Sequence, residues 1–180
     1  MLSPLVRVIE EAAGDSPWAL IGAAALTLRE VDTRSPNLEF MVGAEALQSL
    51  ARMLGVSSKW GRGAYVAAER LHFMRHGVPV FVFSRPTFHG RYESLSPFDV
   101  PALWDARETI EVGGVGVPVL PCEWELVLAV VLEQRTRIEL LQGHFAQYGF
   151  DNRLLVRLLR EGRVEKDTEE AVWAVVEGRA

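Results

Sequence analysis

Apolar side chains recur along the first third of this chain in two periods, one helical and one extended. Positions three and four apart share one face of a helix, whereas short continuous or alternating apolar runs are typical of strands. On this basis the sequence predicts helices over residues 2–13, 23–29 and 44–54, and strands over residues 18–21 and 38–42. Gly55 is expected to end the third helix.

The middle of the chain contains two candidate hairpins, each turning at glycine. Arg75-His76-Gly77 and Gly113-Gly114 are the expected turns. The sequence predicts paired strands over residues 64–74 with 78–84, and over residues 109–112 with 115–120. It further predicts loops over residues 60–63 and 86–98 and a short helix over residues 101–107.

The last third is helical by the same criterion. Pro121 is expected to begin the longest helix, which runs to about residue 148 and breaks at Gly143. Asp151 is expected to cap the next helix, whose leucines form an apolar stripe. The segment 167–170, Asp-Thr-Glu-Glu, resembles a capping box for the final helix.

Strands that alternate with helices indicate an α/β protein with a mixed sheet and flanking helices. We expect residues 1–120 to form this α/β region and residues 121–180 to form a helical C-terminal region packed on it. Short connections favour one compact body over two separate units.

Composition narrows the possible functions without naming one. A net charge of -5 argues against general nucleic-acid binding, which is normally served by a basic face. No apolar run is long enough to span a bilayer, and the N-terminus lacks the shape of a signal peptide, so we expect a cytoplasmic protein without a membrane partner. Cys122 is the sole cysteine and is expected to be structural, although it stands at a predicted helix start.

The segment 18–42 carries the strongest functional signal. A buried strand runs into Gly22 at a helix start, and a loop with Arg34 then leads to Asn37-Leu38-Glu39 on the next strand. This arrangement resembles the nucleotidyltransferase superfamily, whose pattern is an apolar strand, Gly followed by Gly or Ser, a helix, and Asp-x-Asp on the next strand. The segment 78–84 resembles the later strand of this family, which usually brings a third carboxylate. The segment 117–127 is similar to the strand-then-helix entry of a bacterial branch that includes toxins of the abortive-infection type.

The resemblance implies a nucleotidyltransferase-like fold and a set of roles. Gly22 and Ala23 would lie against the phosphates of a nucleotide triphosphate, with Arg34 neutralising charge beside them. Asn37 and Glu39 stand where the paired carboxylates are expected. Because residues two apart on a strand point to the same side, both would face a catalytic Mg²⁺ if the protein is active.

The departures from the family pattern predict weak or lost transfer activity. Asn37 replaces the first acid, and the strand at 78–84 has none to serve as the third. One unit charge about 4 Å from an ion contributes roughly 4 kcal/mol at an effective dielectric of about 20. Each missing carboxylate is therefore equivalent to a rate loss on the order of a thousandfold. Asp32 and Asp99 are the alternative acids if the assignment of these positions is wrong.

Three functions remain open from the sequence, the third being an active transferase with an unusual metal site. The first is a nucleotidyltransferase-like protein that binds a nucleotide but has weak or lost transferase activity. The second is a non-catalytic interaction protein, such as a toxin–antitoxin or assembly partner, which would form a stable complex and have no nucleotide affinity.

Overall fold

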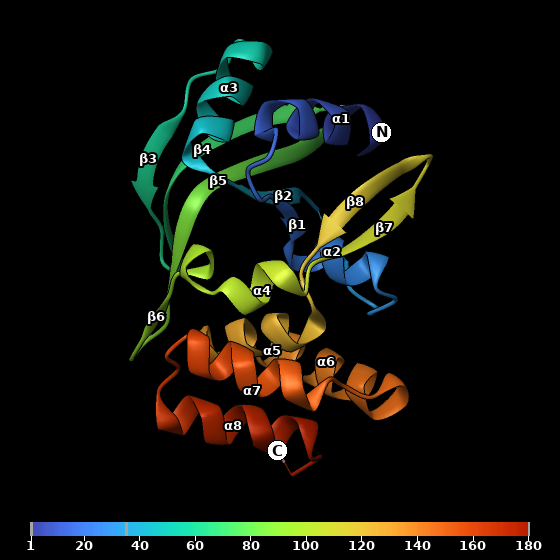
Figure 1. The fold of residues 1–180 in the computed structure, drawn as a ribbon, viewed down its shortest axis with the longest axis vertical. Coiled ribbons are helices and arrows are strands. Elements are labelled where there is room, and N and C mark those ends of the chain that lie inside the picture. The colour runs from blue at the N-terminus through green and yellow to red at the C-terminus, as the bar shows by residue number, and fades with distance from the viewer. Residues whose placement is uncertain (1, 35, 180) are drawn as a thin grey trace.

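A single mixed sheet runs through the molecule, with helices on both of its faces (Figure 1). The computed structural model describes residues 2–34 and 36–179, and the statements of structure below refer to them. The described helices are α1 (Leu2–Ala13), α2 (Gly22–Leu28), α3 (Ala44–Leu54), the 3-10 turn η1 (Pro97–Asp99), α4 (Pro101–Asp105), α5 (Cys122–Val131), α6 (Arg135–Tyr148), α7 (Asn152–Glu161) and α8 (Lys166–Val176). The described strands are β1 (Ala19–Ile21), β2 (Leu38–Val42), β3 (Lys59–Arg62), β4 (Val66–Arg75), β5 (Val78–His89), β6 (Ser94–Leu95), β7 (Glu108–Val112) and β8 (Val115–Val119).

The strands lie in the order β3-β4-β5-β2-β1-β8-β7, and β6 pairs with β5 outside this path. The β2–β5 and β1–β8 pairs are parallel, and the other pairs are antiparallel. The predicted α/β fold with a mixed sheet is therefore confirmed.

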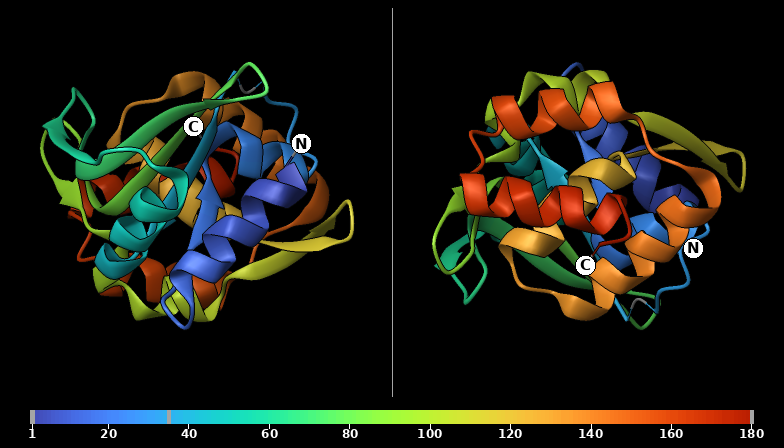
Figure 2. Two further views of the ribbon diagram at one scale, coloured as in Figure 1. Left: turned by 90° about the horizontal axis from the view of Figure 1, so that it is seen from above. Right: turned by 90° about the horizontal axis from the view of Figure 1, so that it is seen from below.

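Two hydrophobic cores form because successive side chains of a strand point to opposite faces of the sheet. Helices α1 and α3 cover one face, with Leu5, Ile9 and Leu47 packed against strand residues. The C-terminal helices cover the other face, where Trp124 and Leu126 are fully buried. In Figure 2, the view from above shows α1 and α3 lying across the sheet, and the view from below shows the C-terminal helices in orange and red.

Most locally predicted elements are confirmed. The run β1-α2-β2-α3 and both hairpins lie where the sequence places them, with Gly77 and Gly113-Gly114 at positive φ in the turns. The Asp151 side chain accepts hydrogen bonds from two backbone N–H groups of α7, at 2.9 and 3.0 Å, as predicted for a cap. None of the described helices has the length and apolar character needed to cross a membrane.

Two predicted loops are wrong, because strand pairing extends into both. Residues 59–62 form β3, an edge strand held by β4. Strand β5 continues past Pro86 because Ala67 pairs with Thr87 while Glu69 pairs with Ser84, which leaves Arg85 and Pro86 in a bulge. A bulge frees proline from donating a ladder hydrogen bond, so proline does not end the strand here.

The predicted single helix over residues 121–148 is also wrong. The helix ends after Val131, where the N–H of Glu133 donates to Val130 and that of Gln134 donates to Ala129. This is a Schellman ending, with Glu133 at φ 53 in the position usually held by glycine. Gly143, by contrast, lies inside the continuous helix α6.

The capping box predicted at residues 167–170 does not form. Glu93, from the turn before β6, accepts hydrogen bonds from the backbone N–H of Glu165 at 3.1 Å and from the Thr168 hydroxyl. The start of α8 is therefore capped by a residue more than seventy positions away in the sequence.

Candidate functional site

The alternation of β2 decides on which side Glu39 lies. Phe40 and Val42 belong to the core under α1 and α3, whereas Met41 belongs to the core under the C-terminal helices. Glu39 is on the same side as Met41, since residues two apart on a strand share a face. Its carboxyl group consequently lies between the sheet and α5.

A cavity of about 250 Å³ occupies this space. Its wall is mainly apolar but includes several polar side chains. The lining residues are Ile21, Gly22, Glu39, Met41, Tyr65, Val66, Phe83, Phe88, Leu120, Trp124, Glu125, Leu128, Leu132, Gln134 and Arg137. We call it the inner cavity.

Gly22 connects the predicted motif to the inner cavity. Its φ of +68° is a left-handed conformation that favours glycine, and a Cβ there would lie 2.7 Å from Oε2 of Glu39. Its backbone N–H donates to Oε1 of Glu125 at 3.4 Å. The backbone N–H of Gly22, which by the resemblance would lie against a phosphate, is therefore hydrogen-bonded to a carboxylate of the protein itself.

The structure brings Glu39 and Asn37 together. Nδ2 of Asn37 donates to Oε1 of Glu39 at 3.1 Å. Burial raises the pKa of Glu39, and the nearby Arg137 guanidinium and the Asn37 hydrogen bond oppose this increase.

Glu125 is a site residue that the sequence reasoning missed. It lies on α5, its exposed fraction is 1%, and its Oε2 is 3.8 Å from Nη1 of Arg137. Burial raises the pKa of Glu125 as well, and Arg137 again opposes the increase. The signal was an acid within the apolar run 122–131, where a charge is not expected unless it is partnered.

An open hollow adjoins the inner cavity and holds the other predicted residues. It is lined by Ala23, Asp32, Thr33, Arg34, Glu133, Gln134, Arg135, Thr136, Arg137 and Leu140. Gln134 and Arg137 line both spaces, so the inner cavity and this outer hollow meet at these two side chains. The predicted pair Ala23 and Arg34 therefore lies beside the inner cavity, together with two arginines of α6 that the sequence reasoning missed.

The other candidate acids do not complete a set of three around Glu39. On β5, the residue paired with Glu39 is Phe81, whose ring stacks on His72 with centroids 4.4 Å apart. Asp99 pairs with Arg85 at 3.3 Å, and Asp32 lines the outer hollow.

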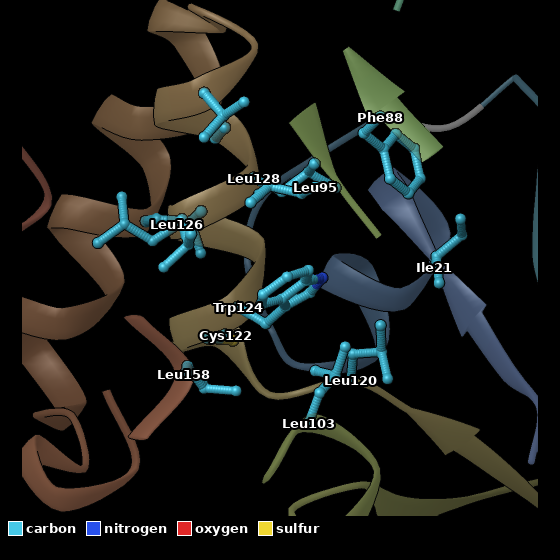
Figure 3. Packing of buried hydrophobic residues seen from close by; sticks show 14 of the residues in the cluster. Ile21, Phe88, Leu95, Leu103, Leu120, Cys122, Trp124, Leu126, Leu128 and Leu158 are labelled. Carbon is cyan, nitrogen blue, oxygen red and sulfur yellow. The ribbon is translucent and has the colours of Figure 1, made fainter. Parts of the chain in front are cut away.

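Several buried polar atoms near the inner cavity lack hydrogen-bond partners within residues 2–34 and 36–179. Among them are Nε1 of Trp124, Oε2 of Glu125 and Oε1 of Gln134. Figure 3 shows Trp124 between α5 and the sheet, with its indole nitrogen directed toward Ile21 and Phe88. Buried polar groups are normally hydrogen-bonded, so a cavity lined by three residues with such atoms is suited to a polar ligand.

The site does not fit a two-metal centre. Within the described chain, no group of three or more His, Cys, Asp or Glu side chains is placed to hold a metal ion. Of the nearby acids, Glu125 already accepts from Gly22, and the Arg137 guanidinium lies within ion-pair distance of it. A fixed cation in this position repels a second one and makes a divalent ion less favourable.

Cys122 lies at the start of α5 and is buried. Burial raises the pKa of its thiol to about 12, against the opposing charge of Arg29. The thiol is un-ionised at neutral pH and so has no nucleophilic character there.

Comparison with known proteins supports the nucleotidyltransferase fold. No protein-family model and no curated protein sequence matches the chain. A protein from Thermotoga maritima, described provisionally as a nucleotidyltransferase, superposes with a TM-score of 0.59 at 14% identity, over 81% of this chain and 92% of that one. An antigenic nucleotidyltransferase-like protein from Paracoccidioides brasiliensis gives 0.46 at 14% identity, over 99% of this chain and 88% of that one. The antibiotic-resistance factor ANT(2'')-Ia gives 0.46 at 11% identity, over 99% and 92%.

The fold assignment rests on the Thermotoga protein, since the other two superpose less well. At such low identity the likeness defines the class of fold and leaves activity to the site itself.

Proposed function

We propose that this protein binds a nucleotide in the inner cavity and outer hollow, without metal-dependent transfer of a nucleotidyl group. The observation that carries the proposal is that the two spaces meet at Gln134 and Arg137. The inner cavity is largely apolar and the less open of the two, and the outer hollow is more open and bears arginines. A nucleotide has the same division between an aromatic base and a charged phosphate chain.

The arginines of the outer hollow supply the positive charge for phosphate. Arg34, Arg135 and Arg137 line it, against two acids, Asp32 and Glu133. Guanidinium groups bind phosphate through paired hydrogen bonds, which are stronger than neutral ones. In this proposal the arginines take the place of the metal ions that would otherwise neutralise a polyphosphate.

The lack of transfer chemistry is inferred from the acidic residues of the site, which are too few to hold two metal ions. Transfer through two metal ions depends on carboxylates that hold both ions. Here Asn37 occupies the first position, Phe81 is the β5 neighbour of Glu39, and Arg137 lies beside Glu125. The groups present favour binding over activation of an attacking hydroxyl.

Calorimetric titration with the four ribonucleoside triphosphates, in EDTA and then in Mg²⁺ or Mn²⁺, tests the proposal. We expect binding in EDTA that Arg135→Ala weakens roughly tenfold, since one charge-assisted hydrogen bond contributes about 1.5–3 kcal/mol. Arg52→Ala is the matched control, because Arg52 is an exposed arginine on α3, across the sheet from the site. No label should pass from an α-labelled nucleotide to protein, RNA or a small acceptor.

Other results would point to other functions. Binding that requires a divalent ion and disappears in Glu39→Ala would return Glu39 and Asn37 to a metal-holding role. Absence of binding under every condition would contradict the proposal and favour the interaction protein, for which a pull-down from the native cell would be the next experiment.

A further inference from the structure

The hydrogen-bonding groups of the inner cavity also indicate which ring it accepts. This inference rests on the proposed function and concerns the apolar part of the same site. The buried atoms without a hydrogen-bond partner include one donor, Nε1 of Trp124, and two acceptors, Oε1 of Gln134 and Oε2 of Glu125. The Glu125 oxygen lies 3.8 Å from Nη1 of Arg137, at ion-pair distance. Trp124 and Glu125 are 0% and 1% exposed, so neither atom can reach bulk water from its position.

The remainder of the wall suits a flat, apolar body. Tyr65, Phe83 and Phe88 line the inner cavity with aromatic rings, and leucines complete the wall. Aromatic side chains stack on heteroaromatic rings with little dependence on sequence or substituent. A volume of about 250 Å³ is smaller than the roughly 300–1,000 Å³ of a site for a drug-sized ligand, so the inner cavity accommodates a single ring system.

We propose that the inner cavity binds a heteroaromatic ring that carries an amino group next to a ring nitrogen. The ring nitrogen would accept from Trp124, and the amino group would donate to Glu125 or Gln134. Adenine and cytosine present an amino donor at this edge, whereas hypoxanthine and uracil present a carbonyl acceptor there. A carbonyl facing the oxygens of Glu125 and Gln134 would leave buried acceptors unpaired, which opposes binding.

The experiment uses nucleosides, which lack phosphate, together with inorganic triphosphate as a separate probe of the outer hollow. We expect adenosine and cytidine to bind at least about tenfold more tightly than inosine and uridine. Equal affinity for adenosine and inosine would overturn the base preference. Triphosphate binding is measured in parallel. If triphosphate binds, the proposed nucleotide function stands even when the base preference fails; if triphosphate does not bind, the proposed function fails as well.

Two variants separate the hydrogen bond from the packing. Trp124→Phe keeps an aromatic ring and removes the N–H, and it should weaken adenosine binding about tenfold while leaving triphosphate binding unchanged. Trp104→Phe is the matched control, because the Trp104 indole donates to the carbonyl of Pro97 at 3.0 Å and does not line the inner cavity. Circular dichroism would confirm that both variants fold.

Gln134→Leu provides an independent test if Trp124→Phe fails to fold. It removes one unpaired acceptor at similar size, and we expect the preference for adenosine over inosine to fall severalfold. An unchanged preference in a folded Gln134→Leu or Trp124→Phe protein would refute the assignment of these atoms to ligand binding.

Discussion

Replacing Gly22 by alanine tests the central geometry of the site. Gly22 has φ +68°, and an added Cβ would lie 2.7 Å from Oε2 of Glu39. Two separate penalties follow, one from the backbone conformation and one from the contact with a carboxyl group that is itself hydrogen-bonded by Asn37. The contact can be relieved only if the Glu39 carboxyl group moves.

The magnitudes can be separated. A residue with a Cβ in the left-handed region is destabilised by about 1–2 kcal/mol. An extra methyl group in a packed interior adds about 1–3 kcal/mol. Gly22→Ala should thus lower the free energy of unfolding by about 2–5 kcal/mol, or Tm by roughly 4–20 °C for a chain of this size.

A matched variant isolates the backbone contribution. Gly55 has φ +64°, and a Cβ there would meet open space among the described residues. Gly55→Ala should therefore show only the backbone penalty of about 1–2 kcal/mol. The assay is urea unfolding followed by tryptophan fluorescence.

A double-mutant cycle with Glu39→Ala then measures the contact. In the Glu39→Ala background, Gly22→Ala should be no more destabilising than Gly55→Ala, because the clashing oxygen is gone. Strict additivity of the two substitutions would refute the reasoning, and so would equal effects of Gly22→Ala and Gly55→Ala in the otherwise unmodified protein.

Three further expectations concern ionisation and capping. Burial raises the pKa of Glu125 above its ordinary value of 4.5, so the folded state holds more protons than the unfolded chain above that pH, and stability falls as the pH rises toward the folded pKa. Glu125→Gln should be more stable than the wild type at about pH 8 and lose this advantage at about pH 4, as measured by urea unfolding at each pH. Asp151→Ala should lower the free energy of unfolding by about 1 kcal/mol through loss of the α7 cap. Asp167→Ala should change it by less than about 0.5 kcal/mol, and equal effects would contradict the capping assignment. Iodoacetamide should modify Cys122 slowly in the native protein and rapidly in urea, as followed by mass spectrometry, because burial raises the thiol pKa to about 12.

The candidate site divides into parts that were predictable and parts that were not. Gly22, Ala23, Arg34, Asn37 and Glu39 lie within eighteen positions of one another. A strand-helix-strand unit brings such residues together through local geometry. In the structure Gly22 and Glu39 line the inner cavity, Ala23 and Arg34 line the outer hollow, and Asn37 donates a hydrogen bond to Glu39. Their roles toward a ligand remain proposals.

Only the tertiary structure added Glu125 and Arg137. Glu125 accepts a hydrogen bond from the backbone N–H of Gly22, which is 103 positions away in the sequence. Neither side chain has a partner within its own helix that would indicate this role. Their position depends on how α5 and α6 pack on the sheet, which is decided by contacts between distant segments.

The sequence by itself determined the elements whose signals are local. The periodicity of residues 2–54, the glycine turns of both hairpins and the Asp151 cap depend on neighbouring residues alone, because backbone dihedrals and nearby side chains set them. Tertiary structure decided the rest. Strand β3 forms because it pairs with β4, and β5 continues past Pro86 through a bulge. Helix α5 ends after Val131, with Glu133 in the left-handed conformation usual for glycine, and α8 is capped by Glu93. The two strand features and the α8 cap are stabilised by partners in other segments, so no pattern confined to one segment could predict them. The α5 ending is closed by local backbone hydrogen bonds, but Glu133 holds a position where the usual sequence signal is glycine.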